Sequence, residues 1–174
     1  MYSKIIRFHK ETKTFHLYND KISYIIQILE NGQLGNLYYG KKIHHQEDFS
    51  YLLEGRLRSL AVYTKENDYF MSPQYTKMEY PDIGRGDFRE PAYEILQENG
   101  SRITSFSYKS HQIFQGKKKL KGLPATYVES EKEADTLEIL LEDDLIGMQI
   151  ILSYTIFAEY PVIARSVKFL KQEH

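Results

Sequence analysis

Residues 79–92 read Glu79-Tyr80-Pro81-Asp82-Ile83-Gly84-Arg85-Gly86-Asp87-Phe88-Arg89-Glu90-Pro91-Ala92, with two prolines and two glycines between flanking apolar segments. Because proline fixes φ and glycine adopts backbone angles that other residues avoid, this density predicts a shaped surface loop. Asp87 and Arg89 lie two positions apart, so on an extended chain they share a face, where they can hydrogen-bond a ligand or each other. Acid and base groups in such turns more often hold backbone amides and carbonyls in place, and we favour that structural role.

On both sides of this loop, short apolar alternations bounded by turn residues predict antiparallel strands. We expect about nine strands, at residues 15–18, 22–29, 34–39, 92–97, 102–108, 111–114, 136–142, 148–157 and 162–169. Asn31-Gly32 and Asn99-Gly100 predict hairpin turns, and only Asp48 to Leu53 predicts a helical turn. Sheets of this size need a second layer over their apolar face, so the predicted fold class is all-β, an antiparallel β-sandwich.

Length and composition narrow the classes of protein to which this chain can belong. The chain has 174 residues, 41% of them hydrophobic and 14% aromatic, which is enough for the core of one domain. It contains no cysteine, and its start lacks the apolar run of a signal peptide, so we expect a soluble, cytoplasmic protein. The 23 basic and 24 acidic residues give a net charge of -1, which predicts neither nucleic-acid nor membrane binding.

The acidic residues do not form a convincing catalytic pair. Two carboxyl groups that act together on one bond, one as nucleophile and the other as acid and base, must lie about 5 to 5.5 Å apart. Glu138 and Glu142 share a strand face but lie about 13 Å apart by the rise per residue. Asp143 and Asp144 are adjacent in a turn, where aspartate commonly caps amides.

Histidine and lysine clusters also favour structural interpretations. His44-His45, with Glu47 and Asp48 nearby, suggests a metal site, but adjacent histidines point apart on a strand, so we favour a solvated loop. His16 and His111 lie among apolar alternating residues, as histidines hydrogen-bonded on a sheet face do. The lysine run 117–121 could bind phosphate, but it lacks interleaved aromatics and is better explained as a solvated hairpin tip.

Two further observations concern polar and aromatic residues. Arg165 is the polar exception on the strand face shared by Ile163, Val167 and Phe169, so its burial would require a carboxylate partner. The 15 tyrosines and nine phenylalanines exceed what an ordinary core needs. Most of them are expected to pack in the sheets, and the excess is compatible with sugar stacking or with a large interface.

Several short blocks of this sequence, in order, are similar to one known family. They include the loop at 79–92, Asn99-Gly100-Ser101, Gly122-Leu123-Pro124-Ala125-Thr126-Tyr127, Leu152-Ser153-Tyr154-Thr155 and Ile163-Ala164-Arg165-Ser166. With these blocks the chain resembles the amino-terminal, supersandwich-like β-sandwich domain of the glycoside hydrolase family 36 α-galactosidases, or melibiases. Ordered blocks along nearly the whole chain are stronger evidence than any one of them.

The resemblance implies that residues 1–174 are a single β-sandwich domain of a larger enzyme, whose catalytic (β/α)₈ barrel is absent from this sequence. Such a parent enzyme removes terminal α-linked galactose from melibiose, raffinose and related oligosaccharides by double displacement, with no metal or organic cofactor. In the family both catalytic aspartates belong to the barrel. We therefore expect no catalytic residue in this chain and no activity from it alone. The sequence leaves open whether the sandwich is complete at its carboxyl end.

The resemblance also implies a role in assembly. In tetrameric members of the family, the amino-terminal domain drives oligomerisation, and one of its loops helps to close the active site of a neighbouring subunit. The corresponding region here is residues 49–58, where Glu54, Arg56 and Arg58 are the candidate substrate-binding residues, since a carboxylate accepts hydrogen bonds from vicinal sugar hydroxyls. A solvated loop or an interface salt bridge is the alternative for these residues. For the whole chain, the alternative is a free-standing galactoside-binding module.

Overall fold

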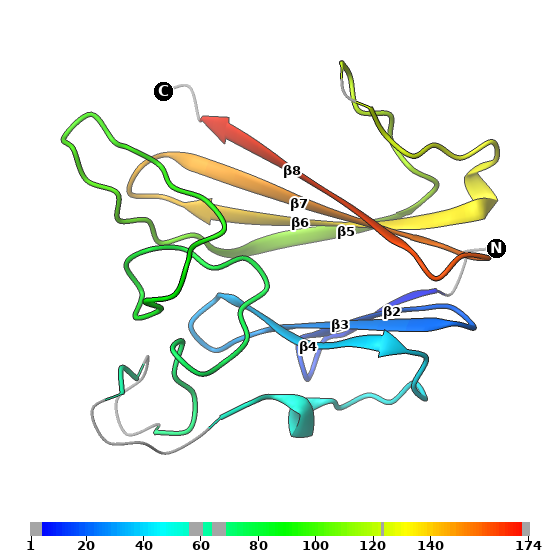
Figure 1. Cartoon of the computed structure of the whole chain (residues 1–174), viewed down its shortest axis with the longest axis horizontal. Coiled ribbons are helices and arrows are strands. Elements are labelled where there is room, and N and C mark those ends of the chain that lie inside the picture. The colour runs from blue at the N-terminus through cyan, green and yellow to red at the C-terminus, as the bar shows by residue number, and fades with distance from the viewer. Residues whose placement is uncertain (1–4, 56–60, 64–68, 123, 172–174) are drawn as a thin grey trace.

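The computed structural model describes residues 5–55, 61–63, 69–122 and 124–171, which fold into two four-stranded antiparallel sheets. The first sheet contains β1 (Ile6–His9), β2 (Thr14–Tyr18), β3 (Ile22–Ile28) and β4 (Leu34–Lys41). The second contains β5 (Ser107–Gln115), β6 (Ala134–Asp143), β7 (Met148–Phe157) and β8 (Ile163–Lys171). In both sheets the strands follow one another in chain order. Figure 1 shows the two sheets stacked face to face, which confirms the predicted sandwich.

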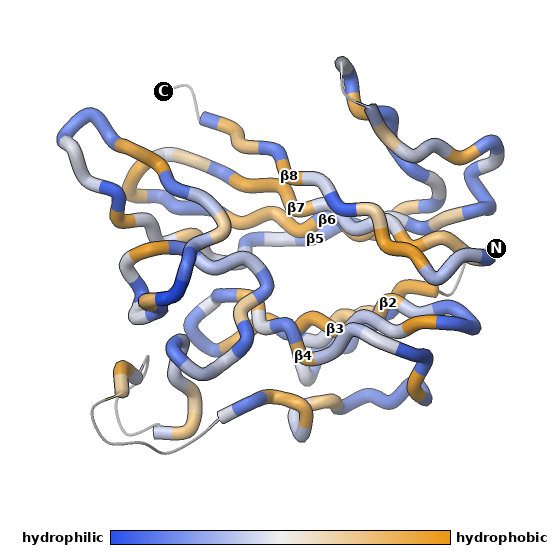
Figure 2. The backbone as a smooth tube through the Cα atoms, in the orientation of Figure 1, coloured by the Kyte–Doolittle hydropathy of each residue, from blue (hydrophilic) through white to orange (hydrophobic). Residues whose placement is uncertain are grey.

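The main core lies between the sheets and is built by the period-2 alternation of the strands. The inner faces of the central strands β2, β3, β6 and β7 contribute the fully buried residues, among them Phe15, Leu17, Ile26, Leu137, Ile139, Leu152 and Ile156. Figure 2 shows apolar stretches along the strands of both layers, whereas the connecting segments alternate between hydrophilic and apolar stretches. Removing this apolar surface from water is the main driving force for the fold.

The long connection (residues 42–106) joins the two sheets and also covers the first one. Its first part, the cover segment (residues 42–53), runs along the outer face of the first sheet and contains the 3₁₀ helix η1 (Ser50–Leu52). Phe49 of this segment is completely buried. Ile25 of β3 is also completely buried, yet it does not belong to the main core, which contains the residues on either side of it, Tyr24 and Ile26. A second, smaller core follows, in which Leu53 packs against Leu29, Met71 and Met78.

Several predicted elements need correction. Residues 92–97 and 102–106 are not strands: the Asn99-Gly100 turn forms, with Gln97 accepting from Gly100 (2.9 Å), but its arms bond the 79–92 loop only at single points such as Thr104 to Ile83 (3.2 Å). The predicted strand 111–114 is part of β5, which starts at Ser107 and carries a register shift between Tyr108 and Ser110.

Two short elements differ from the prediction in kind. β1 was not predicted, because its four residues carry too little alternation to stand out. The helical turn expected at Asp48 to Leu53 exists as the 3₁₀ helix η1, and a second one, η2 (Glu131–Glu133), begins with a capping box on Ser130. Lys65-Glu66-Asn67-Asp68, whose charges interrupt the apolar pattern and predict the tip of a hairpin, lie outside the described residues. In the part of the chain that the structure covers, neither helix has the length or hydropathy of a membrane span.

Candidate functional site

The 79–92 loop begins with a carboxylate buried between the two sheets. The hydroxyl of Tyr24 on β3 donates to Glu79 (2.6 Å), and so do the hydroxyl of Tyr154 on β7 (3.0 Å) and the amide of Asn36 on β4 (2.6 Å). Arg165 of β8 completes the shell with an ion pair of 2.7 Å. Burial, with the charge of Glu79 acting in the same direction, raises the pKa of the Tyr24 hydroxyl, which therefore stays a donor. The carboxylate partner that Arg165 requires is thus Glu79, far away in the sequence.

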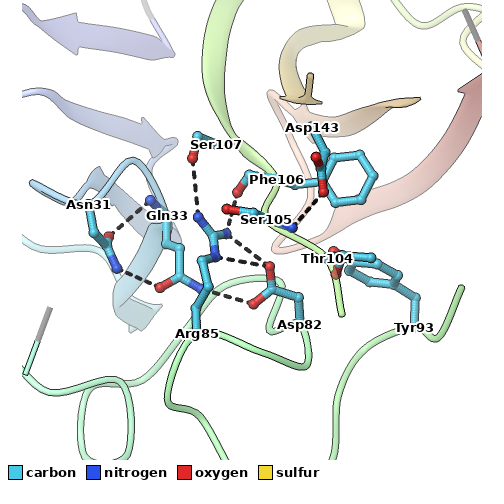
Figure 3. A network of polar contacts seen from close by, with 10 residues as sticks. All are labelled: Asn31, Gln33, Asp82, Arg85, Tyr93, Thr104, Ser105, Phe106, Ser107 and Asp143. Atoms are coloured by element: carbon cyan, nitrogen blue, oxygen red, sulfur yellow. Dashed lines mark hydrogen bonds and ion pairs between the residues drawn. The ribbon is translucent and has the colours of Figure 1, made fainter. Parts of the chain in front are cut away.

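The middle of the loop is fixed by a second buried ion pair, shown in Figure 3. Arg85 pairs with Asp82 (2.9 Å) and donates to Ser107 Oγ (3.1 Å) and to the carbonyl of Phe106 at the start of β5. The other oxygen of Asp82 accepts from Gln33 (3.1 Å), which lies in the β3–β4 turn. Burial raises the pKa of Asp82, and the charge of Arg85 opposes that rise. One ion pair therefore joins the loop to both sheets.

The end of the loop is a clamp on the backbone of the segment that precedes it, at residues 73–76. Arg89 forms a bidentate pair with buried Asp87 (2.8 Å for each oxygen) and donates to the carbonyls of Pro73 (2.8 Å) and Thr76 (2.7 Å). Fixed in this way, Asp87 and Arg89 hold backbone groups in place, which is the structural role that we favoured for them. Gly86, at φ +86°, supplies a backbone angle that the clamp requires.

The clamp also positions the candidate residue Glu54. Thr76, whose carbonyl Arg89 binds, donates through Oγ1 to the carbonyl of Glu54 (3.1 Å). Hydrogen bonding to Asp87 raises the pKa of Arg89, and the charge of Glu54 acts in the same direction, so the two side chains lie within electrostatic reach. The Glu54 side chain is exposed, next to Leu53 in the smaller core. Arg56 and Arg58 lie outside the described residues.

Exposed aromatic residues occur in the segments that hold Glu54 and pack beside it, which the overall tyrosine and phenylalanine count indicated only in general terms. The exposed fractions are 64% for Tyr51, 52% for Tyr69 and 52% for Phe70. A Cβ atom on Gly55 would lie 2.4 Å from the Phe70 ring, so the absence of a side chain there lets the ring pack against the backbone beside Glu54. Aromatic faces, a free carboxylate and a half-exposed guanidinium are the groups that bind sugar rings and their hydroxyls.

The acid pairs considered from the sequence have other partners. Glu138 pairs with Lys118 (2.9 Å), and Glu142 pairs with Lys109. Asp143 caps the β6–β7 turn by accepting from the amide of Leu145 (3.1 Å), as aspartate in a turn commonly does. These carboxylates therefore serve the sheet and its turns.

The histidine and lysine clusters also have defined surroundings. Among the described residues, Lys118 of the lysine run pairs with Glu138, and its ammonium group lies over the Phe114 ring. Among the described residues no group of three or more histidine, cysteine or acidic side chains could hold a metal ion. His44 is exposed, but the solvated-loop interpretation is wrong for His45, which bonds to two other histidines.

Comparison with known proteins assigns the fold and this loop to a family. Residues 32–174 match the Glycosyl hydrolase family 36 N-terminal domain, and the chain belongs to that family. It is 42% identical, over 165 residues, to the α-galactosidase AgaA of Geobacillus stearothermophilus, a match that covers 94% of this chain and 22% of AgaA.

Solved structures agree with this assignment. An α-galactosidase from Lactobacillus brevis has a TM-score of 0.89 at 38% identity, over 94% of this chain and 22% of that one. A variant of G. stearothermophilus AgaA in complex with raffinose has a TM-score of 0.84 at 42% identity, over 91% of this chain and 22% of that one. The chain thus spans less than a quarter of the length of these relatives.

Proposed function

We propose that this chain is the non-catalytic amino-terminal domain of an α-galactosidase that hydrolyses terminal α-galactosyl residues of oligosaccharides such as melibiose and raffinose. The observation that carries the proposal is the family match over residues 32–174, supported by α-galactosidase relatives that align over almost the whole chain. The raffinose complex of one relative supports the substrate class. A cytoplasmic location fits the lack of cysteine.

Catalysis in this proposal belongs to residues outside the chain. Double displacement needs one carboxyl as nucleophile and a second as acid and base. The buried carboxylates Glu79, Asp82 and Asp87 are each paired with an arginine of the same fold, which occupies their oxygens. A folded sample should release no chromophore from a chromogenic α-galactoside. Turnover that persists through further purification would contradict this part of the proposal.

The second part of the proposal is a role in assembly and in closing the active site of a neighbouring subunit. The exposed surface of Glu54, Tyr51 and Phe70 supports it, because a carboxylate and apolar rings together suit a galactosyl group. Arg56 and Arg58 stay candidates for the same contact.

The test uses a full-length enzyme that carries this domain. Glu54→Gln should raise KM for raffinose several-fold with little change in kcat, because it removes a hydrogen-bond acceptor of the bound sugar. The matched control is Glu94→Gln, which alters an exposed pair with Arg102 and should leave both constants unchanged. Equal KM values for the two variants would remove Glu54 from the site. Analytical sedimentation of the same full-length enzyme measures its oligomeric state and so tests the role in assembly.

A free-standing galactoside-binding module is the second candidate, favoured by the exposed rings beside Glu54. The two functions differ in what the isolated chain does. A module binds galactose or melibiose saturably by itself, whereas a domain that completes a neighbour's pocket shows no saturable binding alone. Titration of the chain with melibiose by calorimetry separates them.

A further inference from the structure

Three histidines from different segments form one hydrogen-bonded row on the outer face of the first sheet. His9 on β1 contacts His45 of the cover segment through their Nε2 atoms (3.0 Å). His45 contacts His16 on β2 through their Nδ1 atoms (2.9 Å). The Nε2 atom of His16 lies 3.0 Å from Ser23 Oγ on β3, so the row extends from β1 to β3 through the cover segment.

The row also lies at the point where the cover segment is attached. The backbone amide of Ile43 donates to Ser23 Oγ (3.1 Å), and the Phe49 ring packs edge-on against His16 at 5.0 Å between centroids. His16 and Phe49 are both fully buried, whereas His9 is only partly buried. One end of the row is therefore open to protons from solvent and the other end is not.

Counting protons shows what this row can hold. Each of its two nitrogen–nitrogen contacts needs one hydrogen between the atoms, and the contact with Ser23 needs a third. Three neutral imidazoles carry three ring hydrogens, and the row is satisfied whether Ser23 donates or accepts. One more proton fits on the outer nitrogen of His9, with every contact kept. A second extra proton sets two N–H groups against each other at one of the two nitrogen–nitrogen contacts and places two cations in the row.

We propose that His9, His45 and His16 form an acid-sensitive latch that holds the cover segment on the first sheet and releases it when a second extra proton enters. Other ionisable groups around the latch act on it as well. They are Arg7 on β1, Tyr18 on β2 and Glu47 on the cover segment.

The direction of the pH effect follows from the surroundings of the latch. Burial, then the neighbouring His45, His9 and Arg7, lower the pKa of His16 from 6.5 to about 4. Burial and the charges of His9 and Arg7 lower the pKa of His45, and Glu47 opposes them. The released form therefore takes up protons more readily than the closed form, so closure is favoured at neutral pH and is lost as the pH falls from about 6.5 towards 4. For His16 alone, the opening constant rises about 20-fold between pH 7 and pH 5.

Two measurements on the whole chain test the latch. In a nitrogen-15 NMR titration of the histidine side chains, His16 and His45 should titrate below the ordinary histidine pKa of 6.5. Amide hydrogen exchange should show protection factors for residues 43–50 that fall about 20-fold from pH 7 to pH 5, while β6 stays protected. If His16 and His45 titrate at the ordinary value, or if the protection does not change, the proposal is wrong.

Matched variants locate the effect. His45→Gln interrupts the row, so residues 43–50 should exchange quickly at both pH values, with less than a threefold difference between them. His44→Gln changes the neighbouring residue and should keep the wild-type fall. A 20-fold fall that persists in His45→Gln would overturn the latch even if the variant is fully folded. Circular dichroism checks that both variants are folded. The side-chain titration is carried out on the unmodified chain, so it does not depend on either variant.

The cover segment leads directly to Glu54, so release would also move the proposed galactoside contact. Only this consequence rests on the proposed function. In a full-length enzyme, KM for raffinose should then rise below pH 6 in the wild type and stay level in His45→Gln. A level KM in the wild type, together with a confirmed latch, would remove Glu54 from the sugar site without affecting the latch.

Discussion

The two sheets and the long connection between them are held together by different means. Within each sheet, every strand pairs with its chain neighbour along an antiparallel ladder, which is interrupted by one register shift in β3–β4 and one in β5–β6. The inner faces of the two sheets share one apolar core. The described parts of the long connection have no strand, and they depend on buried ion pairs and on side chains that bind backbone carbonyls.

This difference has an energetic consequence. In a ladder the stabilising contacts are many and individually small, so substitution of a core residue acts on the whole cooperative unit. In the long connection a few polar side chains each form hydrogen bonds with several other groups. One substitution therefore leaves several donors without an acceptor within a small region. We therefore expect global losses of stability from the core and more local losses from the connection.

The largest effect should come from the centre of the sandwich. Leu137 on β6 is fully buried, and Leu137→Ala leaves a cavity that should cost about 3 kcal/mol of unfolding free energy. Urea denaturation followed by circular dichroism measures it, with Leu145→Ala as control because that side chain is 92% exposed. Equal midpoints for the two variants would mean that the core between the sheets is not the main source of stability.

The next largest effect should come from the residue that joins the two regions. Glu79→Gln removes the charge that Arg165 requires and turns an acceptor towards the Asn36 amide into a donor. We expect a loss of about 2 kcal/mol, below the usual cost for a buried pair because the Arg165 side chain is 47% exposed and regains water. Glu94→Gln is the matched control. The melting temperature of Glu79→Gln should be the lower of the two, and equal melting temperatures would contradict the prediction.

The sequence predicted the ladder region well and the connection poorly. Strands such as β6 and β7 have a local signal, since their alternation lies within a few residues. The partner of Arg165 could be predicted as a carboxylate, but its identity as Glu79 depends on how two sheets pack. The predicted turn at Asn99-Gly100 is present. The two segments that flank it do not form a ladder, because a turn alone does not provide a strand partner, and they are therefore irregular.

The candidate site shows the same limit. Glu54 was proposed through the family resemblance, whereas the ring of Phe70, which packs against Gly55, comes from a segment whose proximity depends on the smaller core. His45 and His16 were each found in the sequence, but nothing in either motif indicated that they bond to each other.

A smaller and local effect is expected from the clamp in the connection. Asp87→Ala removes the acceptor that aligns Arg89 with the carbonyls of Pro73 and Thr76. It should cost about 1.5 kcal/mol. Hydrogen exchange should show the loss first in residues 72–78, while β6 and β7 keep their protection. A uniform loss over both sheets would show that the connection unfolds only with the sandwich.

Two glycines allow the same substitution, glycine to alanine, to be compared in the sheets and in the long connection. Gly32 in the β3–β4 turn and Gly100 in the connection both follow asparagine and have φ values of +79° and +81°. An added Cβ meets nothing within 4 Å at Gly100, but it lies 2.9 Å from Ser107 Cβ at Gly32. Gly100→Ala should therefore cost only backbone strain, about 1 kcal/mol or less, because the irregular arms can relax. Gly32→Ala should cost about 2 kcal/mol, since strain and clash act on a ladder joined to β5. Thermal melts of the pair give the ratio, and equal shifts would show that residues 92–106 are coupled to the sheets as firmly as a strand is.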